Sequence, residues 1–405
     1  MLDDSLLDDP AALQRADRDH ALLALAGAGA RIRTALRQVE PGLAQLRPDG
    51  RPRAVLVAGH GGALTAAAAA LAALAGTGTL VQPVAPLDVT PAPPGDPFSA
   101  GLTWQLPGWA GPLDLLVIAS AAGTEAGLIT LAEQAYARGC AITVIAPEGR
   151  PLAQAALQVR ALPLSFVSAT TEEPAAETAE RDLPAEDPAA LWAFLTPLLA
   201  LADRLGVLEQ GAADLAATAD LLDELAVRYR PDAAAYLNQA KGLAAQLSGT
   251  VPLIWSEGPV AAAAAERFAE QLADRAGRPA VTGRLPQVLG AHRGMFTGQL
   301  GTGADPEDFF RDRVEEPDPL MLQVLLLRHT PQEPAAVEEV PPEAVPEPAP
   351  AGHAVRRAQR LAADHEVRLT EFAGLRPQPL AAFAELVALT DFAAVYLGLA
   401  GGAGR

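Results

Sequence analysis

The stretch AVLVAGHGGALTAAAAALAALA, from Ala54 to Ala75, decides the fold that the sequence predicts. Its first five residues form a short apolar run with the length of a buried strand. The glycine turn Gly59–Gly62 follows, and an alanine-rich segment of helical character comes after it. A strand, a tight turn and a helix in this order open a βαβ unit. We therefore predict a parallel sheet with helices packed against it.

The same order of elements returns twice along the chain. In the first block, the strand Leu113–Ala119 leads through the turn Ser120–Glu125 into a helix and then the strand Ala141–Ala146. In the second block, the strand Val251–Trp255 leads into the helix Val260–Ala276. Alternation of strands and helices is typical of a doubly wound parallel sheet, whose ligands bind at the carboxyl ends of the strands.

Composition divides the chain into six expected segments. We predict a helical amino-terminal segment, two α/β domains separated by connecting helices, a disordered tract rich in Pro, Glu and Ala, and carboxyl-terminal helices that complete the second domain. Their expected ranges are 1–50 for the first helices, 51–170 for the first domain, 171–230 for the acidic linker and connecting helices, 231–330 for the second domain, 331–352 for the disordered linker and 353–405 for the last helices.

The charge balance excludes several classes of partner. Of the 405 residues, 49 are acidic and 30 are basic, which gives a formal net charge of −19. The one lysine is Lys241 and the arginines are scattered, so the clustered cations that nucleic acid or an anionic membrane surface requires are missing. The apolar stretch Gly61–Leu80 consists largely of Ala, Gly and Thr, which predicts a buried crossover helix rather than a membrane span.

The single cysteine, Cys140, excludes a disulfide framework and a cysteine-ligated zinc site within this chain. The acidic start, MLDDSLLDDP, is unlike a signal peptide, and we expect a cytoplasmic protein without metal or cofactor.

The turns between strands and helices carry the candidate chemistry, because no Walker A, HExxH, GxSxG or Rossmann GxGxxG motif occurs at such a junction. The turn Gly59–Gly62 could present backbone N–H groups to an anion at a helix amino terminus, or it could serve only for close packing. The turn Ser120–Glu125 leaves the same two interpretations open, with Thr124 as a phosphate donor or as a helix cap. On residue type alone, we expect His292 to be a structural or exposed residue in a loop. Asp274 and Arg275 would ordinarily form a solvated ion pair near the end of a helix.

Four stretches resemble the bifunctional phosphoglucose/phosphomannose isomerase family, in the order in which that family carries them. They are Gly59-His-Gly-Gly-Ala63, similar to the family's GxGGS turn; Asn238-Gln-Ala-Lys241 before Val251-Pro-Leu-Ile254, similar to its NPAK helix and strand; Leu285-Pro-Gln-Val-Leu-Gly-Ala-His292, similar to its PExxH loop; and Asp391-Phe-Ala-Ala-Val-Tyr-Leu397, similar to its last helix. The resemblance implies two doubly wound, flavodoxin-like sugar isomerase (SIS) domains with parallel sheets.

The resemblance also implies a reaction and a ligand. Such enzymes interconvert glucose 6-phosphate or mannose 6-phosphate with fructose 6-phosphate through an enediol, and they form homodimers with sites between subunits. Carried over by position, Asp274 is the carboxylate base and His292 is the ring-opening acid/base. The sugar phosphate would lie against Gly59, Gly61, Gly62, Ser120 and Thr124.

Several positions depart from the family pattern. The hydroxyls of its SxSGNT phosphate loop are largely absent, because Ala119 and Ala121 replace the two serines. Pro188 stands where the family has an arginine that would stabilise the enediolate, and Asp274 is one methylene shorter than the usual glutamate. Two functions therefore remain open: an aldose–ketose isomerase, or a weak or inactive SIS protein that binds a sugar phosphate or a partner protein and regulates.

Overall fold

The computed structural model describes residues 4–48, 50–91, 98–166, 186–208, 211–297, 321–329 and 352–402. The chain divides into two compact units: unit A comprises Gly27–Asp223, and unit B comprises Met1–Ala26 together with Glu224–Arg405. Most of the predicted acidic linker and nearly all of the predicted disordered tract, residues 331–351, lie outside the described residues.

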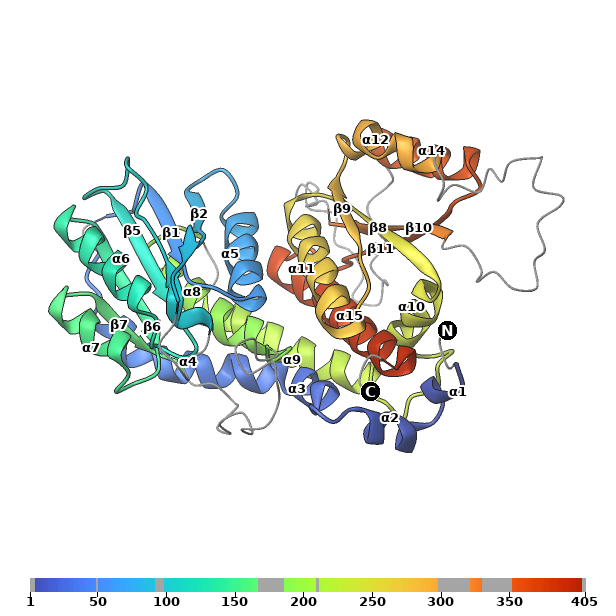
Figure 1. The fold of residues 1–405 in the computed structure, drawn as a ribbon, viewed down its shortest axis with the longest axis horizontal. Coiled ribbons are helices and arrows are strands. Elements are labelled where there is room, and N and C mark those ends of the chain that lie inside the picture. The colour runs from blue at the N-terminus through green and yellow to red at the C-terminus, as the bar shows by residue number, and fades with distance from the viewer. Residues whose placement is uncertain are drawn as a thin grey trace, which may run out of the picture. The chain divides into compact units, whose positions relative to one another are not determined.

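Unit A is built on a five-stranded parallel sheet (Figure 1). Its central strands are apolar and buried on both faces, as expected of a parallel sheet covered by helices. The strands run in the spatial order β2-β1-β5-β6-β7, and their bounds are β1 (Ala54–Ala58), β2 (Leu80–Val84), β5 (Asp114–Ala119), β6 (Ala141–Ala146) and β7 (Leu162–Ser165). A 3₁₀ turn, η1 (Phe98–Gly101), lies in the chain between the two strands of a small antiparallel pair, β3 (Asp88–Val89) and β4 (Leu102–Thr103).

Helices cover both faces of the unit A sheet. One face packs against α6 (Ala126–Ala137) and α7 (Pro151–Gln158) in a continuous apolar cluster. The other face carries α4 (Ala28–Gln45), α5 (Gly62–Ala75) and α8 (Ala190–Arg204), which pack on one another. The next helix, α9 (Ala212–Arg228), runs across the division between the units.

Unit B repeats this architecture with four parallel strands (Figure 1). The strands are β8 (Thr250–Glu257), β9 (Val281–Arg284), β10 (Met321–Arg328) and β11 (Arg368–Ala373), in the spatial order β11-β10-β8-β9. Taken in chain order, this is the arrangement of the first four strands of the unit A sheet. The predicted α/β class with two doubly wound sheets is thereby confirmed.

The helices of unit B also lie on two faces. One face holds α10 (Gln239–Leu247), α11 (Pro259–Ala276) and α15 (Pro379–Gly401), which pack on one another. The other holds α12 (Val288–Ala291), α13 (Arg293–Phe296) and α14 (His353–Asp364) around a core that includes Trp255. Three short helices from the start of the chain complete the unit: α1 (Asp4–Leu7), α2 (Pro10–Ala16) and α3 (Ala21–Ala26).

Lys241 ties the start of the chain to unit B. Its side chain is buried, and Nζ donates to the carbonyl oxygens of Leu7, Pro231 and Ala233 at 2.6, 2.6 and 2.8 Å. Burial lowers the pKa of this ammonium group. The lysine of the predicted NQAK motif therefore has a structural role here.

Helix α15 is long and apolar enough to cross a membrane by length and composition alone. However, 89% of its most apolar window is buried, and it packs against α10 and α11. These contacts are those of the central core helix of unit B.

Two local predictions were wrong or incomplete. The segment 353–405 was expected to be helical, but α14 ends at Asp364 and the chain then forms β11, which pairs with β10 at the edge of the sheet. The edge strands β2, β7 and β9 were not predicted. Pro83, Pro163 and Gly283 interrupt them, and such residues are tolerated at a sheet edge but weaken the strand pattern in the sequence.

Candidate functional site

The order of strands in unit A places the two predicted loops side by side at the carboxyl edge of the sheet. The sheet changes its winding direction between β1 and β5, so the loops that follow these strands lead away from each other and leave a crevice at their carboxyl ends. Gly59, Gly61 and Gly62 follow β1, while Ser120 and Thr124 follow β5. The structure therefore brings together the five residues predicted to hold phosphate.

The glycines after β1 are required by packing. A Cβ at Gly59 would lie 2.3 Å from the carbonyl oxygen of Ala119 and 2.2 Å from Leu64 Cδ2. Gly61 has φ of +99° and is the amino-terminal cap residue of α5, a conformation that favours glycine. The packing interpretation of this turn is thus sufficient to explain Gly59 and Gly61.

The loop after β5 satisfies most of its own hydrogen bonds. Ser120 Oγ accepts from the N–H groups of Gly123 at 2.7 Å and Ala122 at 3.1 Å, and it donates to Glu125 Oε2 at 2.7 Å. The N–H of Thr124 also donates to Glu125 Oε2, at 3.0 Å. The N–H of Thr124, which was expected to bind phosphate, is therefore already engaged.

Glu125 is the centre of this network. Its carboxylate is fully buried and accepts a third hydrogen bond from His60 Nε2 at 3.1 Å. Burial raises the pKa of Glu125, but the hydrogen bonds from His60 and Ser120 outweigh burial, and the net pKa is lowered. An ionised carboxylate thus accepts the Thr124 N–H that the sequence prediction assigned to an external anion.

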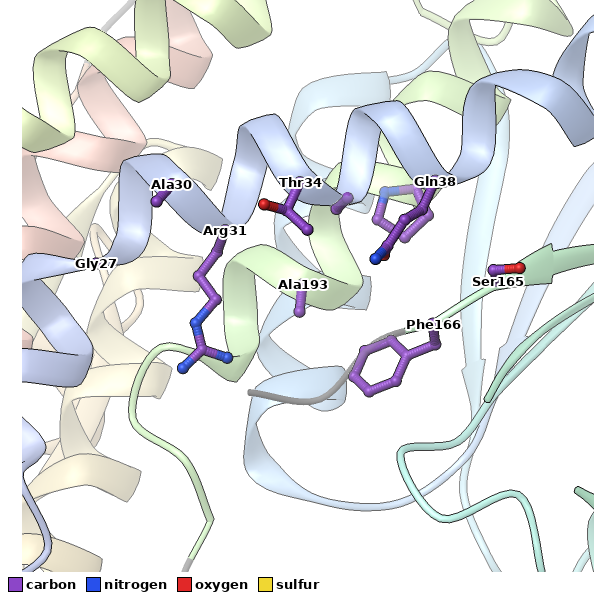
Figure 2. A pocket seen from close by; sticks show the side chains of 10 residues that line it. Gly27, Ala30, Arg31, Thr34, Gln38, Ser165, Phe166 and Ala193 are labelled. Atoms are coloured by element: carbon purple, nitrogen blue, oxygen red, sulfur yellow. The ribbon is translucent and has the colours of Figure 1, made fainter. Parts of the chain in front are cut away.

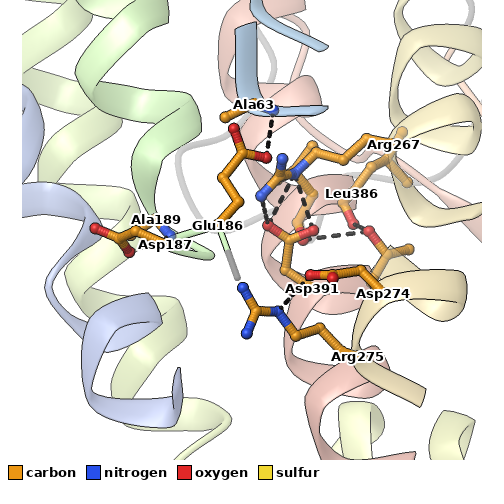
Figure 3. Close-up of polar contacts among 11 residues, drawn as sticks. Ala63, Glu186, Asp187, Ala189, Arg267, Asp274, Arg275, Leu386 and Asp391 are labelled. Atoms are coloured by element: carbon orange, nitrogen blue, oxygen red, sulfur yellow. Dashed lines mark hydrogen bonds and ion pairs between the residues drawn. The ribbon is translucent and has the colours of Figure 1, made fainter. Parts of the chain in front are cut away.

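A second carboxylate lies at the amino end of α5. Glu186 Oε2 accepts from the N–H of Ala63 at 2.9 Å, as Figure 3 shows. The next residue, Asp187, forms an ion pair with Arg31 of α4 at 2.6 Å. Of the predicted phosphate donors, the Thr124 hydroxyl has no partner among the described residues.

His292 lies at the carboxyl end of the unit B sheet, after β9 and α12. Its side chain is buried with 7% exposure, and its Nδ1 accepts from Trp255 Nε1 at 3.1 Å. Burial lowers the pKa of His292. The ring is therefore neutral, with its proton on Nε2.

Asp274 lies near the carboxyl end of α11, with its carboxylate 2.9 Å from Arg275 Nε (Figure 3). Helix α11 starts at the carboxyl end of β8 and returns toward the amino edge of the sheet, and Asp274 is about 22 Å along it from Pro259. Unit B therefore does not bring Asp274 and His292 together.

A separate cavity of about 280 Å³ lies in unit A between α4, α8 and the end of β7 (Figure 2). Arg31, Thr34, Gln38 and Ser165 contribute its polar groups, and Phe166 contributes an aromatic face. The Arg31 guanidinium already pairs with Asp187. The cavity holds no pair of acid and base side chains among its lining residues. Within the described ranges, no three His, Cys, Asp or Glu side chains are placed to share a metal ion.

The two residues that sequence reasoning did not select are His60 and Glu125. They are 65 positions apart in the chain, and they meet only because β1 and β5 are neighbours. A histidine between two glycines at a strand-to-helix turn was the one available signal.

Comparison with known proteins supports the architecture. Residues 237–403 match the family model of the bacterial phospho-glucose isomerase C-terminal SIS domain. No curated protein matches the chain.

Solved structures share the fold over nearly the whole chain. A hypothetical protein from Thermus thermophilus is similar with a TM-score of 0.56 and 15% identity, over 98% of this chain and 89% of that one. Glucosamine-6-phosphate deaminase from Thermotoga maritima is similar with a TM-score of 0.52 and 11% identity, over 93% and 92%. Residues 237–403, which lie in unit B, are thus similar to the C-terminal SIS domain of bacterial phospho-glucose isomerases.

Proposed function

We propose that this protein binds a phosphorylated sugar at the carboxyl edge of the unit A sheet, and that it isomerises aldose and ketose phosphates only weakly. The observation that carries the proposal is the meeting of the two loops at the switch point between β1 and β5. The half-buried Thr124 hydroxyl and the His60 ring are two polar groups at this place that remain partly exposed.

The affinity for the phosphate group is expected to be modest. The N–H groups of Ala63 and Thr124 donate to Glu186 and Glu125, so a phosphate would find fewer donors than at an open helix terminus. The two carboxylates also repel a second anion at short range. Sugar hydroxyls must therefore supply part of the binding free energy.

Weak turnover follows from the catalytic positions. Pro188 supplies no cation for an enediolate, and loss of one such donor typically lowers the rate by roughly 10²–10³. The shorter side chain of Asp274 is expected to lower the rate by about another 10² through misplacement.

Asp274 and His292 lie at opposite edges of one sheet, so both could act on one substrate only if two copies of the chain formed the site. We therefore include a homodimer in the proposal. A mass near that of one chain by light scattering would contradict the dimer, and with it a shared role for these two residues.

Binding is tested by calorimetry with fructose 6-phosphate, fructose and inorganic phosphate. We expect fructose 6-phosphate to bind most tightly and Thr124→Ala to weaken its binding by roughly 10- to 100-fold, since one hydrogen bond to a charged group is lost. Thr130→Ala is the matched control, because Thr130 lies on α6 and its exposed hydroxyl bonds only to the carbonyl of Ala126. Absence of fructose 6-phosphate binding would refute the proposal.

Turnover is tested by following glucose 6-phosphate and mannose 6-phosphate formed from fructose 6-phosphate. We expect a low rate in the wild type and a gain in the double variant Pro188→Arg/Asp274→Glu. A turnover above about 1 s⁻¹ that disappears in Asp274→Asn would show instead that the protein is an efficient isomerase.

A further inference from the structure

We infer that His60, held by the buried carboxylate of Glu125, is a proton-transfer residue that opens the ring of the sugar bound in unit A. This inference rests on the proposed sugar site and assigns a role to a residue that the family resemblance leaves without one. His292 is the histidine that the resemblance would use for this step.

The carboxylate of Glu125 is fixed on both of its oxygens. Oε2 accepts from Ser120 Oγ and from the N–H of Thr124, and Oε1 accepts from His60 Nε2. Because the pKa of Glu125 is lowered, the group is ionised and can only accept hydrogen bonds. His60 Nε2 must therefore carry a hydrogen, which leaves the lone pair of the neutral ring on Nδ1.

The other ring nitrogen is available to a ligand. The His60 side chain is 35% exposed, and Nδ1 has no partner in the part of the chain that the structure describes. The ring belongs to the loop after β1, at the switch point where ligands of this fold class bind. A histidine acts as a general base when a carboxylate holds one of its ring nitrogens and the other nitrogen is open to a ligand.

The two other histidines that adjoin the sheets differ in this respect. His292 accepts from Trp255, whereas the ring nitrogens of His329 have no partner within the described ranges, and both side chains are more than nine-tenths buried. Neither has a carboxylate in hydrogen-bond contact that would stabilise a ring cation among the described residues. His60 alone of the three combines exposure with a carboxylate partner.

The reaction is the opening of a cyclic sugar. Nδ1 of His60 accepts the proton of the C1 hydroxyl, the C1–O1 bond becomes a carbonyl and the bond from C1 to the ring oxygen breaks. The imidazolium then returns the same proton from Nδ1 to the former ring oxygen, and the open-chain aldehyde results. One nitrogen can serve both oxygens because both are bonded to C1. The step needs no co-reactant, and ring closure on either face interconverts the two anomers.

The test measures anomerisation of α-glucose 6-phosphate and of α-glucose by NMR, with buffer alone as the baseline. We expect the wild type to accelerate the exchange and His60→Gln to lose about 10²-fold or more of the protein-dependent rate, as is usual for removal of a general base. Glutamine can still donate to Glu125, so the fold is retained. His353→Gln is the control, because His353 is exposed at the start of α14.

Two further variants separate chemistry from structure. Added imidazole is expected to restore part of the rate in His60→Ala. Glu125→Gln is expected to lower kcat while KM stays constant, since Glu125 acts as a positioning residue. Calorimetry with fructose 6-phosphate on wild type and His60→Gln is expected to show a loss of affinity much smaller than the loss of rate.

The outcomes are distinct. A wild-type rate equal to buffer with both sugars, or an unchanged rate in His60→Gln, would overturn the inference even if fructose 6-phosphate binds. Failure to bind fructose 6-phosphate, together with His60-dependent anomerisation of glucose, would support the role of His60 and refute the proposed phosphosugar ligand.

Discussion

The turn after the first strand of each unit must pass close to a carbonyl of the neighbouring strand and then cap a helix. The turn of unit A uses more residues for this than the turn of unit B. In unit B, Gly258 caps α11 with φ of +89°, and a Cβ there would lie 2.1 Å from the carbonyl oxygen of His329. In unit A, Gly61 caps α5, while Gly59 passes the equivalent carbonyl of the neighbouring strand. Two glycines of unit A thus divide the two roles, close approach and helix cap, that one glycine fills in unit B. The longer turn of unit A provides the position that His60 occupies, which is why chemistry is expected in unit A.

The helices that follow these turns differ as well. Helix α5 has no charged side chain, whereas α11 buries Arg267 against Asp391 of α15. Unit A therefore relies on close packing of alanines at this position. Unit B relies on a buried ion pair.

The largest effect is expected from breaking this ion pair. Arg267 and Asp391 have side chains that are 1% and 3% exposed, with donor–acceptor distances of 2.7–3.0 Å. Asp391→Ala leaves a buried guanidinium without its carboxylate and is expected to lower the free energy of unfolding by about 3–5 kcal/mol. The loss in free energy of unfolding is measured by urea denaturation, with the fluorescence of Trp255 reporting on unit B.

The exposed pair Arg230–Asp232 provides the control, and Asp232→Ala is expected to change stability by no more than about 1 kcal/mol. The double variant Arg267→Met/Asp391→Leu should recover most of the loss, because the buried charges are removed together. Equal effects of Asp391→Ala and Asp232→Ala would contradict the contrast between the two helices.

The glycines of the two turns should give the next largest effect. Gly258→Ala places a methyl group against a backbone carbonyl at positive φ and is expected to destabilise by about 3 kcal/mol. At Gly61 the nearest atom is a side-chain oxygen of Glu186, at 2.7 Å, so Gly61→Ala is expected to cost only about 1 kcal/mol.

Gly242→Ala is the matched control in unit B, since this helical glycine has open space around its Cα, and it should stabilise by up to about 1 kcal/mol. Thermal and urea unfolding of the three variants give the comparison. A larger loss at Gly61 than at Gly258 would show that the turns are not related in the way described here.

The sequence could reveal the central strands but not the edges of either sheet. Buried parallel strands such as β1 and β5 are continuous apolar runs, and they stand out against the helical segments. The edge strand β2 contains Pro83 and β9 contains Gly283, and their pairing depends on a neighbour already in place. Tertiary context, rather than local preference, makes them strands.

The candidate site was likewise predictable only in part. The glycine turns could be predicted because glycines between an apolar run and an alanine-rich segment indicate a tight turn from a strand into a helix. That Glu125 and Glu186 occupy the donors was not visible, because each contact depends on a loop position set by the sheet. Identical residue types could equally have left the donors open to phosphate.

The histidines of unit B give a smaller, pH-dependent effect. Burial lowers the pKa of His292 and, despite nearby Glu385, that of His329 below the ordinary 6.5. Below pH 6.5 the unfolded chain therefore binds protons that the folded chain does not, so stability is full above pH 6.5 and falls on acidification. Each histidine contributes a slope of up to about 1.4 kcal/mol per pH unit.

Urea denaturation at intervals from pH 7.5 to 5 measures this slope. His292→Gln should reduce it by the contribution of one histidine. Gly242→Ala changes no titratable group, so it is the control and should leave the slope unchanged. A stability that does not change between pH 7 and 5 would contradict the buried neutral state of His292.

The smallest effect is expected at the residue that follows β5 in unit A and β10 in unit B, the strands next to β1 and β8. Ser120 is the first residue after β5, and its hydroxyl closes the loop through three hydrogen bonds. His329 is the first residue after β10, yet its two buried ring nitrogens have no hydrogen-bond partner within the described residues. Such groups lose hydration and gain nothing in return, so His329→Leu is expected to stabilise unit B by about 1 kcal/mol at pH 7. The gain should grow on acidification, because leucine has no proton to bind. A loss of stability in His329→Leu that is the same at pH 7 and pH 5 would show that the imidazole makes a contact that leucine cannot replace.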